Sequence, residues 1–256
     1  MKYLILSVLL FVSCFLIAQN NVTDTLVIKK DSVHNLKFNY KQLIIPSALI
    51  AYGFIGLNSD QLKGYNSEIK EEVNEHIDEK FTIDDIAQYA PAASVYILNA
   101  CGDKGKNNLK DRSIILATSY LIMTATVLPL KSITKEERPD GSSNNSFPSG
   151  HTATAFAGAE FLWQEYKDKS IWYGISGYVV AAGTGIFRIV NDRHWLTDVA
   201  AGAGIGILST KVAYWIYPYL NNKLFSSKKA KENKVSSMVL PFYNGKQMGC
   251  GLVMQF

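Results

Sequence analysis

Cations and histidines recur at four places in the second half of this sequence, and their types could bind and cleave a phosphate group. The four places are Lys131, then Arg138-Pro139, then Pro148-Ser149-Gly150-His151, and lastly Arg188 with His194 and Asp198. Lysine and arginine neutralise phosphate oxygens, and the planar guanidinium group can bind two oxygens at once. Histidine can act as a nucleophile, an acid or a base near neutral pH. The combination predicts a site for a phosphate oxyanion that works without a metal ion.

The group at 148–151 stands directly before a run of small residues with helical character. Ser149 is a suitable N-cap, and Gly150 would let a ligand approach the backbone. The free amides of the first turn would then point at an anion, which the helix dipole also favours. The alternative is an ordinary helix cap followed by a surface histidine, His151.

His194 and Asp198 are four residues apart, so on a helix they would share a face. A carboxylate bound to one ring nitrogen leaves the other nitrogen free as a nucleophile or base. The alternative is a purely structural pair. Arg188 follows an apolar run, where a half-buried guanidinium group needs an anion.

Lys131 and Arg138 follow the apolar run 114–130, where cations can also serve only to stabilise a helix C-terminus. The co-occurrence of all four groups favours the phosphate site. The two remaining histidines, His34 and His76, lie in polar stretches and are expected at the surface.

Elements that could position these residues are six apolar stretches separated by polar loops. Their lengths and their lack of alternation predict helices, and their many small residues would let helix backbones approach closely. We therefore expect an all-α fold, a bundle of about six core helices, with a seventh, amphipathic helix at Ser67–Lys80. The six stretches are Leu43–Leu57, Ile86–Cys101, Ile114–Leu130, Thr152–Phe161, Ile171–Ile186 and Leu196–Tyr219.

The ends of the chain differ from this central part. A lysine, a short apolar run and small residues near Ala18 predict a secretory signal peptide, because the run is too short to span a bilayer comfortably. Asn244-Gly245 between two apolar stretches predicts a small C-terminal β-hairpin. The expected organisation is a signal peptide at 1–19, a polar linker at 20–41, the helical domain at 42–222, a basic linker at 223–234 and the hairpin at 235–256.

Composition narrows the possible partners. The net charge of +4 is spread thinly along the chain, which argues against nucleic-acid binding. Cys101 and Cys250 could pair in an oxidising compartment or remain buried thiols. Several apolar stretches are shorter than the roughly 20 residues that a membrane span needs. This favours an exported bundle in the periplasm or against a membrane face over a six-span membrane protein, with the site facing away from the cytoplasm in either case.

The pattern Lys131-x6-Arg138-Pro139, Pro148-Ser149-Gly150-His151 and Arg188-x5-His194-x3-Asp198 resembles the three-part signature of the type 2 phosphatidic acid phosphatase (PAP2) superfamily. That superfamily also includes soluble bacterial acid phosphatases and vanadium haloperoxidases. The similarity extends from about Leu43 to Tyr219 and matches all ten signature positions. One departure is Phe187, where the family usually has a serine that donates a hydroxyl group to phosphate.

The resemblance implies a role for each matched residue. His194 would attack phosphorus and form a phosphohistidine, Asp198 would orient its ring, and His151 would protonate the leaving oxygen. Lys131, Arg138 and Arg188, with the amides near Ser149 and Gly150, would bind the phosphate oxygens, so that no metal or other cofactor is expected.

The expected substrate is a lipid-linked phosphate monoester or diphosphate at a membrane surface, such as phosphatidic acid, phosphatidylglycerol phosphate, an isoprenyl diphosphate or a lipid A phosphate. Three alternatives stay open. They are a soluble acid phosphatase of broad specificity, a haloperoxidase that holds vanadate in the phosphate site, and a non-catalytic protein that kept the motif.

Overall fold

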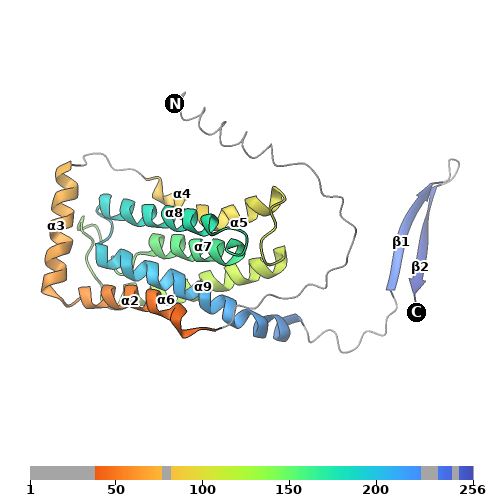
Figure 1. The fold of residues 1–256 in the computed structure, drawn as a ribbon, viewed down its shortest axis with the longest axis horizontal. Helices are drawn as coiled ribbons and strands as arrows, with labels where there is room; N and C mark the ends of the chain where they lie inside the picture. The colour runs from red at the N-terminus through yellow and green to blue at the C-terminus, as the bar shows by residue number, and fades with distance from the viewer. Residues whose placement is uncertain (1–37, 77–81, 226–235, 244–247, 256) are drawn as a thin grey trace, which may run out of the picture. The chain divides into compact units, whose positions relative to one another are not determined.

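A computed structural model describes residues 38–76, 82–225, 236–243 and 248–255 of the chain. The central part is a bundle of α-helices, as Figure 1 shows, so the predicted all-α fold is confirmed. Within the described residues the helices are a 3₁₀ helix Tyr40–Leu43, α2 Ile44–Gly56, α3 Asp60–His76, α4 Asp84–Ala87, α5 Ala90–Ala100, α6 Leu109–Thr134, α7 Gly150–Tyr166, α8 Ile171–Val190 and α9 Leu196–Phe225. The predicted signal peptide and both predicted linkers lie mainly outside these residues.

Most of the observed helices are longer than the apolar stretches from which they were predicted, because polar residues extend their ends. The side chain of Asn108 accepts a hydrogen bond from the amide of Asp111, so α6 begins at Leu109 instead of near Ile114. The stretch predicted at Ile86–Cys101 is divided into α4 and α5, with Pro91 in the first turn of α5.

Helix α7 is the centre of the bundle and contacts α5, α6, α8 and α9 (Figure 1). Ser149 caps it by accepting a hydrogen bond from the amide of Thr152. Ala153, Ala155, Ala157 and Ala159 are fully buried, so most of the surface of its first three turns faces other helices. A helix that is buried on most sides has no polar face, which explains why the sequence shows none here.

Close contact between α7 and α9 depends on glycines. A Cβ atom at Gly206 would lie 2.2 Å from the carbonyl oxygen of Ala153, and one at Gly202 would lie 2.4 Å from the carbonyl oxygen of Ser149. Real Cβ atoms are not found so close to a backbone oxygen, so only glycine allows the two backbones to pack at this separation.

Helix α3 lies across one end of the bundle, where it contacts α2, α8 and α9 (Figure 1). The side chain of Asn66 donates to the hydroxyl of Thr197 at 3.0 Å, and the ammonium of Lys70 donates to the carbonyl of Pro139 at 2.7 Å. The predicted amphipathic helix is therefore present, but it begins at Asp60 and not near Ser67.

Charged residues in the far half of the bundle are buried in pairs. The ammonium of Lys211 in α9 donates to Glu160 in α7 at 2.7 Å, and the hydroxyl of Tyr214 donates to Glu165 at 2.6 Å. Burial of the Lys211 ammonium or the Glu160 carboxylate alone would be costly, so loss of one partner of this ion pair should destabilise the bundle.

The outward faces of the bundle are apolar. Leu121, Leu128, Trp172 and Val179 are among the exposed large hydrophobic residues. Helices α6, α8 and the part Leu196–Lys223 of α9 are long and apolar enough to cross a bilayer. The segments Tyr40–Gly56 and Asp60–Glu75, bent by 93°, would make a fourth crossing if they formed one broken span. This surface favours association with a membrane.

The predicted C-terminal hairpin is also found. Strand β1 (Ser236–Tyr243) pairs antiparallel with β2 (Met248–Gln255), with Ser236 opposite Gln255 and Tyr243 opposite Met248. The Asn244-Gly245 turn itself lies outside the described residues.

Cys101, which was considered as a disulfide partner or a buried thiol, is a free, exposed thiol.

The close contact between α7 and α9 predicts the effect of two matched glycine substitutions. Gly206→Ala should cost about 1–3 kcal/mol because the new methyl group meets the Ala153 backbone. Gly183→Ala in α8 meets nothing within 4 Å and should stabilise its helix by up to about 1 kcal/mol. Thermal unfolding of the purified protein in detergent checks both, at about 2–4 °C per kcal/mol. Equal midpoints for the two variants would contradict the packing account.

Candidate functional site

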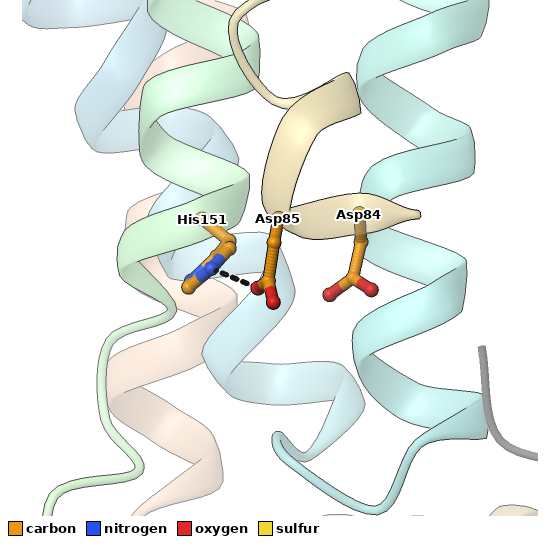
Figure 2. A group of neighbouring side chains, drawn as sticks. All are labelled: Asp84, Asp85 and His151. Carbon is orange, nitrogen blue, oxygen red and sulfur yellow. Dashed lines mark hydrogen bonds and ion pairs between the residues drawn. The ribbon is translucent and has the colours of Figure 1, made fainter. Parts of the chain in front are cut away.

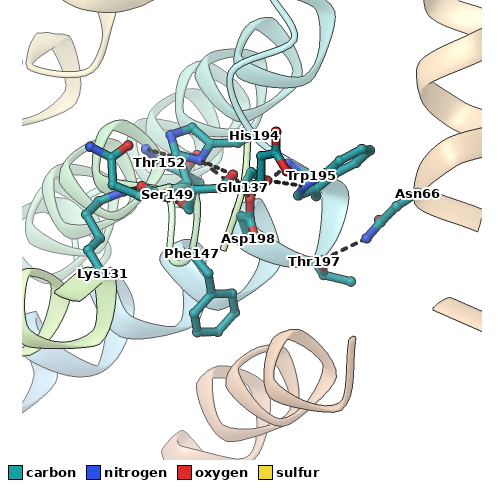
Figure 3. A network of polar contacts seen from close by, with 12 residues as sticks. Asn66, Lys131, Glu137, Phe147, Ser149, Thr152, His194, Trp195, Thr197 and Asp198 are labelled. Carbon is teal, nitrogen blue, oxygen red and sulfur yellow. Dashed lines mark hydrogen bonds and ion pairs between the residues drawn. The ribbon is translucent and has the colours of Figure 1, made fainter. Parts of the chain in front are cut away.

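The predicted site residues come together at one end of the bundle, where α6 and α8 end and α7 and α9 begin. Lys131 lies in the last turn of α6 and Arg188 in the last turn of α8. Gly150 and His151 open α7, and Asp198 lies in the first turn of α9. Arg138, Ser149 and His194 lie in the connections between these helices. Figure 3 shows part of the resulting network.

His194 and Asp198 form the buried centre of the site. The His194 ring is 2% exposed, and its Nδ1 lies 3.6 Å from Asp198 Oδ2. This separation is an ion-pair distance and too long for a direct hydrogen bond. Ser146 bridges the gap, because its hydroxyl donates to Asp198 Oδ2 and lies 3.4 Å from His194 Nδ1. Nε2 is therefore the His194 nitrogen that remains for chemistry.

Asp198 is held in turn by its neighbours in sequence and by α7. Its Oδ2 accepts from the amide of Trp195 at 2.9 Å, and its backbone carbonyl accepts from the amide of Ser149 at 3.0 Å. The second bond ties the start of α9 to the N-cap of α7. The first turn of α7, with its free amides, is thereby fixed next to the pair His194 and Asp198.

Two guanidinium groups in the site have donors without a partner. Arg188 Nε and Arg138 Nε are buried and make no hydrogen bond to any described residue. Buried donors are nearly always paired in folded proteins, so an unpaired donor on a cation suits an anionic ligand. Arg188 is otherwise held by Asp84 of α4, whose Oδ2 accepts from Nη1 at 2.6 Å.

Lys131 contacts the connection between α6 and α7. Its ammonium donates to the carbonyl oxygen of Asn145 and, at 3.3 Å, to that of Ser146. An ammonium group has three donors, so one remains for an anion. The lysine thus supports the segment that carries Ser146 and also adds a positive charge to the site.

His151 lies at the edge of the site, and its side chain is 30% exposed. Its Nε2 lies 2.9 Å from Asp85 Oδ1. The alternative of a surface histidine describes its partial exposure, but the ring is also partly buried and has a carboxylate partner.

Both site histidines favour the neutral form. Burial, followed by the charges of Lys131, Arg188 and Arg138, holds the pKa of His194 well below its usual value. For His151, burial and the Arg188 charge lower the pKa, while Asp85 opposes them. A neutral imidazole is the form that can act as a nucleophile.

One group of side chains could offer ligands to a metal ion. Asp84, Asp85 and His151 each present a ligand atom, all within 4.8 Å of one another (Figure 2). The Arg188 guanidinium group, however, lies 2.6 Å from Asp84 and 3.7 Å from Asp85. This fixed cation neutralises the carboxylates from within the protein.

Sequence reasoning missed three polar residues of the site. Ser146 contacts His194 and Asp198, Asp85 contacts His151, and Asp84 contacts Arg188. Nothing in the local sequence marks them, because Ser146 is one of several polar loop residues and α4 lies over 60 residues before His151 in the sequence. The roles assigned to the expected residues stay predictions.

Comparison with known proteins matches residues 112–222 to the family model of the PAP2 superfamily. The lipid A 1-phosphatase of Porphyromonas gingivalis is 39% identical over 171 residues, which are 64% of this chain and 38% of that protein. The bacitracin transport permease protein BcrC of Bacillus licheniformis is 40% identical over 78 residues, 30% of this chain and 36% of that protein. The chain thus spans less than two fifths of the length of these relatives.

Two solved structures are similar in part. The crystal structure of Aquifex aeolicus LpxE has a TM-score of 0.45 and 22% identity, and covers 58% of this chain and 94% of that one. The transmembrane PAP2-type phosphatidylglycerolphosphate phosphatase from Bacillus subtilis has a TM-score of 0.42 and 20% identity, and covers 73% of this chain and 99% of that one.

The lowered pKa of His194 predicts how stability depends on pH. The unfolded chain takes up a proton near the ordinary histidine value of about 6.5, whereas folded His194 resists it. The free energy of unfolding should therefore fall as pH drops from about 7.5 to 5. The variant His194→Gln should show a shallower fall in denaturant titrations over that range. An identical slope in both proteins would contradict the assignment of a neutral, buried His194.

Proposed function

Because residues 112–222 belong to the PAP2 superfamily, we propose that the chain is a phosphatase that cleaves a lipid-linked phosphate through a phosphohistidine, without a metal ion. The observation that carries this proposal is the arrangement around His194. A neutral, oriented imidazole lies in a buried site with three cations, and two of these cations have unpaired buried donors. Such a site suits a tetrahedral anion with several charged oxygens.

In the proposed reaction, Nε2 of His194 attacks phosphorus and forms a P–N bond. The bond from phosphorus to the leaving oxygen breaks, and its electron pair stays on that oxygen, which takes a proton from His151. Water then attacks the phosphohistidine, gives a proton to His151 and releases phosphate from His194. Asp198 and Ser146 keep Nδ1 of His194 engaged throughout.

Charge neutralisation falls to Arg188, Arg138, Lys131 and the first amides of α7. These fixed groups stand where many phosphatases have metal ions, so the proposed enzyme needs none. Phe187 takes the place of the expected serine, so one hydroxyl donor is missing. The hydroxyl of Thr152 in the first turn of α7 does not replace this donor, because it is already hydrogen-bonded to the Ser149 hydroxyl at 2.9 Å.

A lipid substrate is supported by an apolar groove beside the site. It has a volume of about 550 Å³ and is formed by α2, α6 and α9. The groove extends along α6 from Ile122 to Leu130, the residue that precedes Lys131. This is a path of about 12 Å for an acyl chain whose phosphate lies near Lys131. The relative from Porphyromonas gingivalis, a lipid A 1-phosphatase, makes a lipid A phosphate one substrate to test.

The proposed orientation places the site away from the cytoplasm. Helices α6 and α8 run toward the site end, and α7 and α9 run away from it. The segments 104–112 and 167–169 are rich in lysine and arginine and lie at the opposite ends of α6 and α7, and Lys223 lies in the last turn of α9. Basic segments stay on the cytoplasmic side of membranes. The signal peptide at 1–19 and the division into a domain at 42–222 with flanking linkers remain part of this proposal.

Phosphate release tests the proposed function directly. The purified full chain in detergent micelles with excess EDTA should release phosphate from at least one of phosphatidic acid, an isoprenyl diphosphate and lipid A. His194→Gln, which keeps a buried polar side chain, should lower turnover at least about 1000-fold because the nucleophile is lost. The matched control is Asp168→Asn, at the other end of α7 about 25 Å away, which should retain wild-type activity.

Other outcomes discriminate among the alternatives. Turnover only of p-nitrophenyl phosphate would indicate a soluble type of acid phosphatase, and activity lost in EDTA and restored by a metal would refute the mechanism. For the groove, Ala125→Trp should raise KM for the lipid and leave p-nitrophenyl phosphate unaffected, whereas Ala117→Trp on the same helix should change neither. Halide oxidation with added vanadate and peroxide, without phosphatase activity, would point to a haloperoxidase.

A further inference from the structure

Asp85 stands next to the proposed leaving-group acid although it lies outside the signature motifs. Figure 2 shows the short helix α4 placing Asp84 and Asp85 side by side, with the imidazole of His151 next to Asp85. Asp85 Oδ1 lies 2.9 Å from His151 Nε2. A carboxylate can only accept a hydrogen bond, so Nε2 carries a proton whenever this bond is made.

The two carboxylates divide their contacts. Asp84 is fully buried and binds Arg188 at 2.6 Å and the side-chain amide of Asn191 at 3.3 Å. Asp85 Oδ1 lies 3.7 Å from the same Arg188 nitrogen, outside hydrogen-bond range. Asp84 therefore holds Arg188, and the hydrogen bond of Asp85 is made to His151.

The surroundings of His151 explain why it needs such a partner. Burial and the charge of Arg188 on α8 disfavour the imidazolium form of His151. Asp85 and, more weakly, Asp84 from α4 favour it. Because Asp85 is 57% exposed, its effect on charge is modest, but its hydrogen bond still selects which ring nitrogen holds the permanent proton.

We propose that Asp85 is a positioning residue that keeps the proton on Nε2 of His151 and so assigns all proton exchange with the substrate to Nδ1. This inference rests on the proposed function. When the P–O bond breaks, the leaving oxygen takes the proton from Nδ1, and the ring becomes neutral with Nε2–H bound to Asp85. When water attacks the phosphohistidine, its proton returns to the bare Nδ1, and the ring is again an imidazolium.

The site would then contain two aspartate–histidine pairs with different tasks. Asp198 and Ser146 engage Nδ1 of His194 and leave Nε2 to attack phosphorus, whereas Asp85 engages Nε2 of His151 and leaves Nδ1 to move protons. The opposite choice of nitrogen follows from where each carboxylate lies, on α9 for the first histidine and on α4 for the second.

The test compares Asp85→Asn with the wild type and with Asp168→Asn, an exposed carboxylate that pairs with Lys106. A substrate with a poor leaving group, such as phosphatidic acid, should lose about 10–100-fold in kcat. p-Nitrophenyl phosphate, whose leaving group needs little protonation, should lose less than about 3-fold. The alkaline limb of the pH profile should move to lower pH, because the lost carboxylate no longer favours protonated His151. Asp168→Asn should match the wild type in all three measurements.

A second readout is independent of turnover. In ¹⁵N spectra of the protein labelled at histidine, the His151 ring should be the Nε2–H tautomer above its pKa, and Asp85→Asn should shift the tautomer equilibrium toward Nδ1–H. An unchanged tautomer, or equal losses on both substrates with an unmoved pH limb, would overturn the proposal. Binding of Mg²⁺ or Zn²⁺ by the wild type alone, with a gain in rate, would also overturn it in favour of a metal site. If the wild type cleaves no phosphate at all, the proposed function fails, whereas the tautomer shift would still support the Asp85–His151 pair.

Discussion

The backbone contact between the N-terminus of α7 and the first turn of α9 is the constraint on which the site depends. The amide of Ser149 donates to the carbonyl of Asp198, and Gly202 lies so near the Ser149 carbonyl that no side chain fits between the helices. This contact places the free amides of α7 next to His194. It also explains the small residues of both helices, because larger side chains between α7 and α9 would hold the start of α7 away from the residues around His194.

Three cationic side chains lie around this contact, and some of their hydrogen-bond donors have no partner in the described part of the chain. Arg188 and Arg138 each have a buried Nε without a partner among the described residues. Asp84 accepts from Nη1 of Arg188, and the carbonyls of Asn145 and Ser146 accept from two of the three Lys131 donors. Fixed cations in a dry site favour a multiply charged anion and keep His194 neutral at the same time. One electrostatic arrangement thus supports both binding and nucleophilic attack.

Much of this could be predicted from the sequence, and the omissions have physical reasons. The capping residue Ser149 is a local feature, and it indicated where α7 begins. The spacing of His194 and Asp198 brought the two residues near each other, but not on one helix, because His194 lies in the connection before α9 and its Nδ1 is 3.6 Å from Asp198 Oδ2. The hairpin followed from Asn244-Gly245 between two apolar runs. Ser146, Asp84 and Asp85 were missed because their importance comes from tertiary contacts. Helix α4 reaches His151 only through the folding of the bundle, and a single sequence contains no local signal for such a contact.

A rapid-quench experiment tests the central claim most directly, because it looks for the covalent bond itself. The purified protein is mixed with an excess of the best lipid phosphate, quenched in alkali within milliseconds and digested for mass spectrometry. The account predicts a phosphorylated peptide, stable in alkali and labile in acid, with the phosphate on His194 and absent from His194→Gln. Rapid turnover by the wild type without any phosphate on His194, under conditions that accumulate other phosphohistidines, would contradict it.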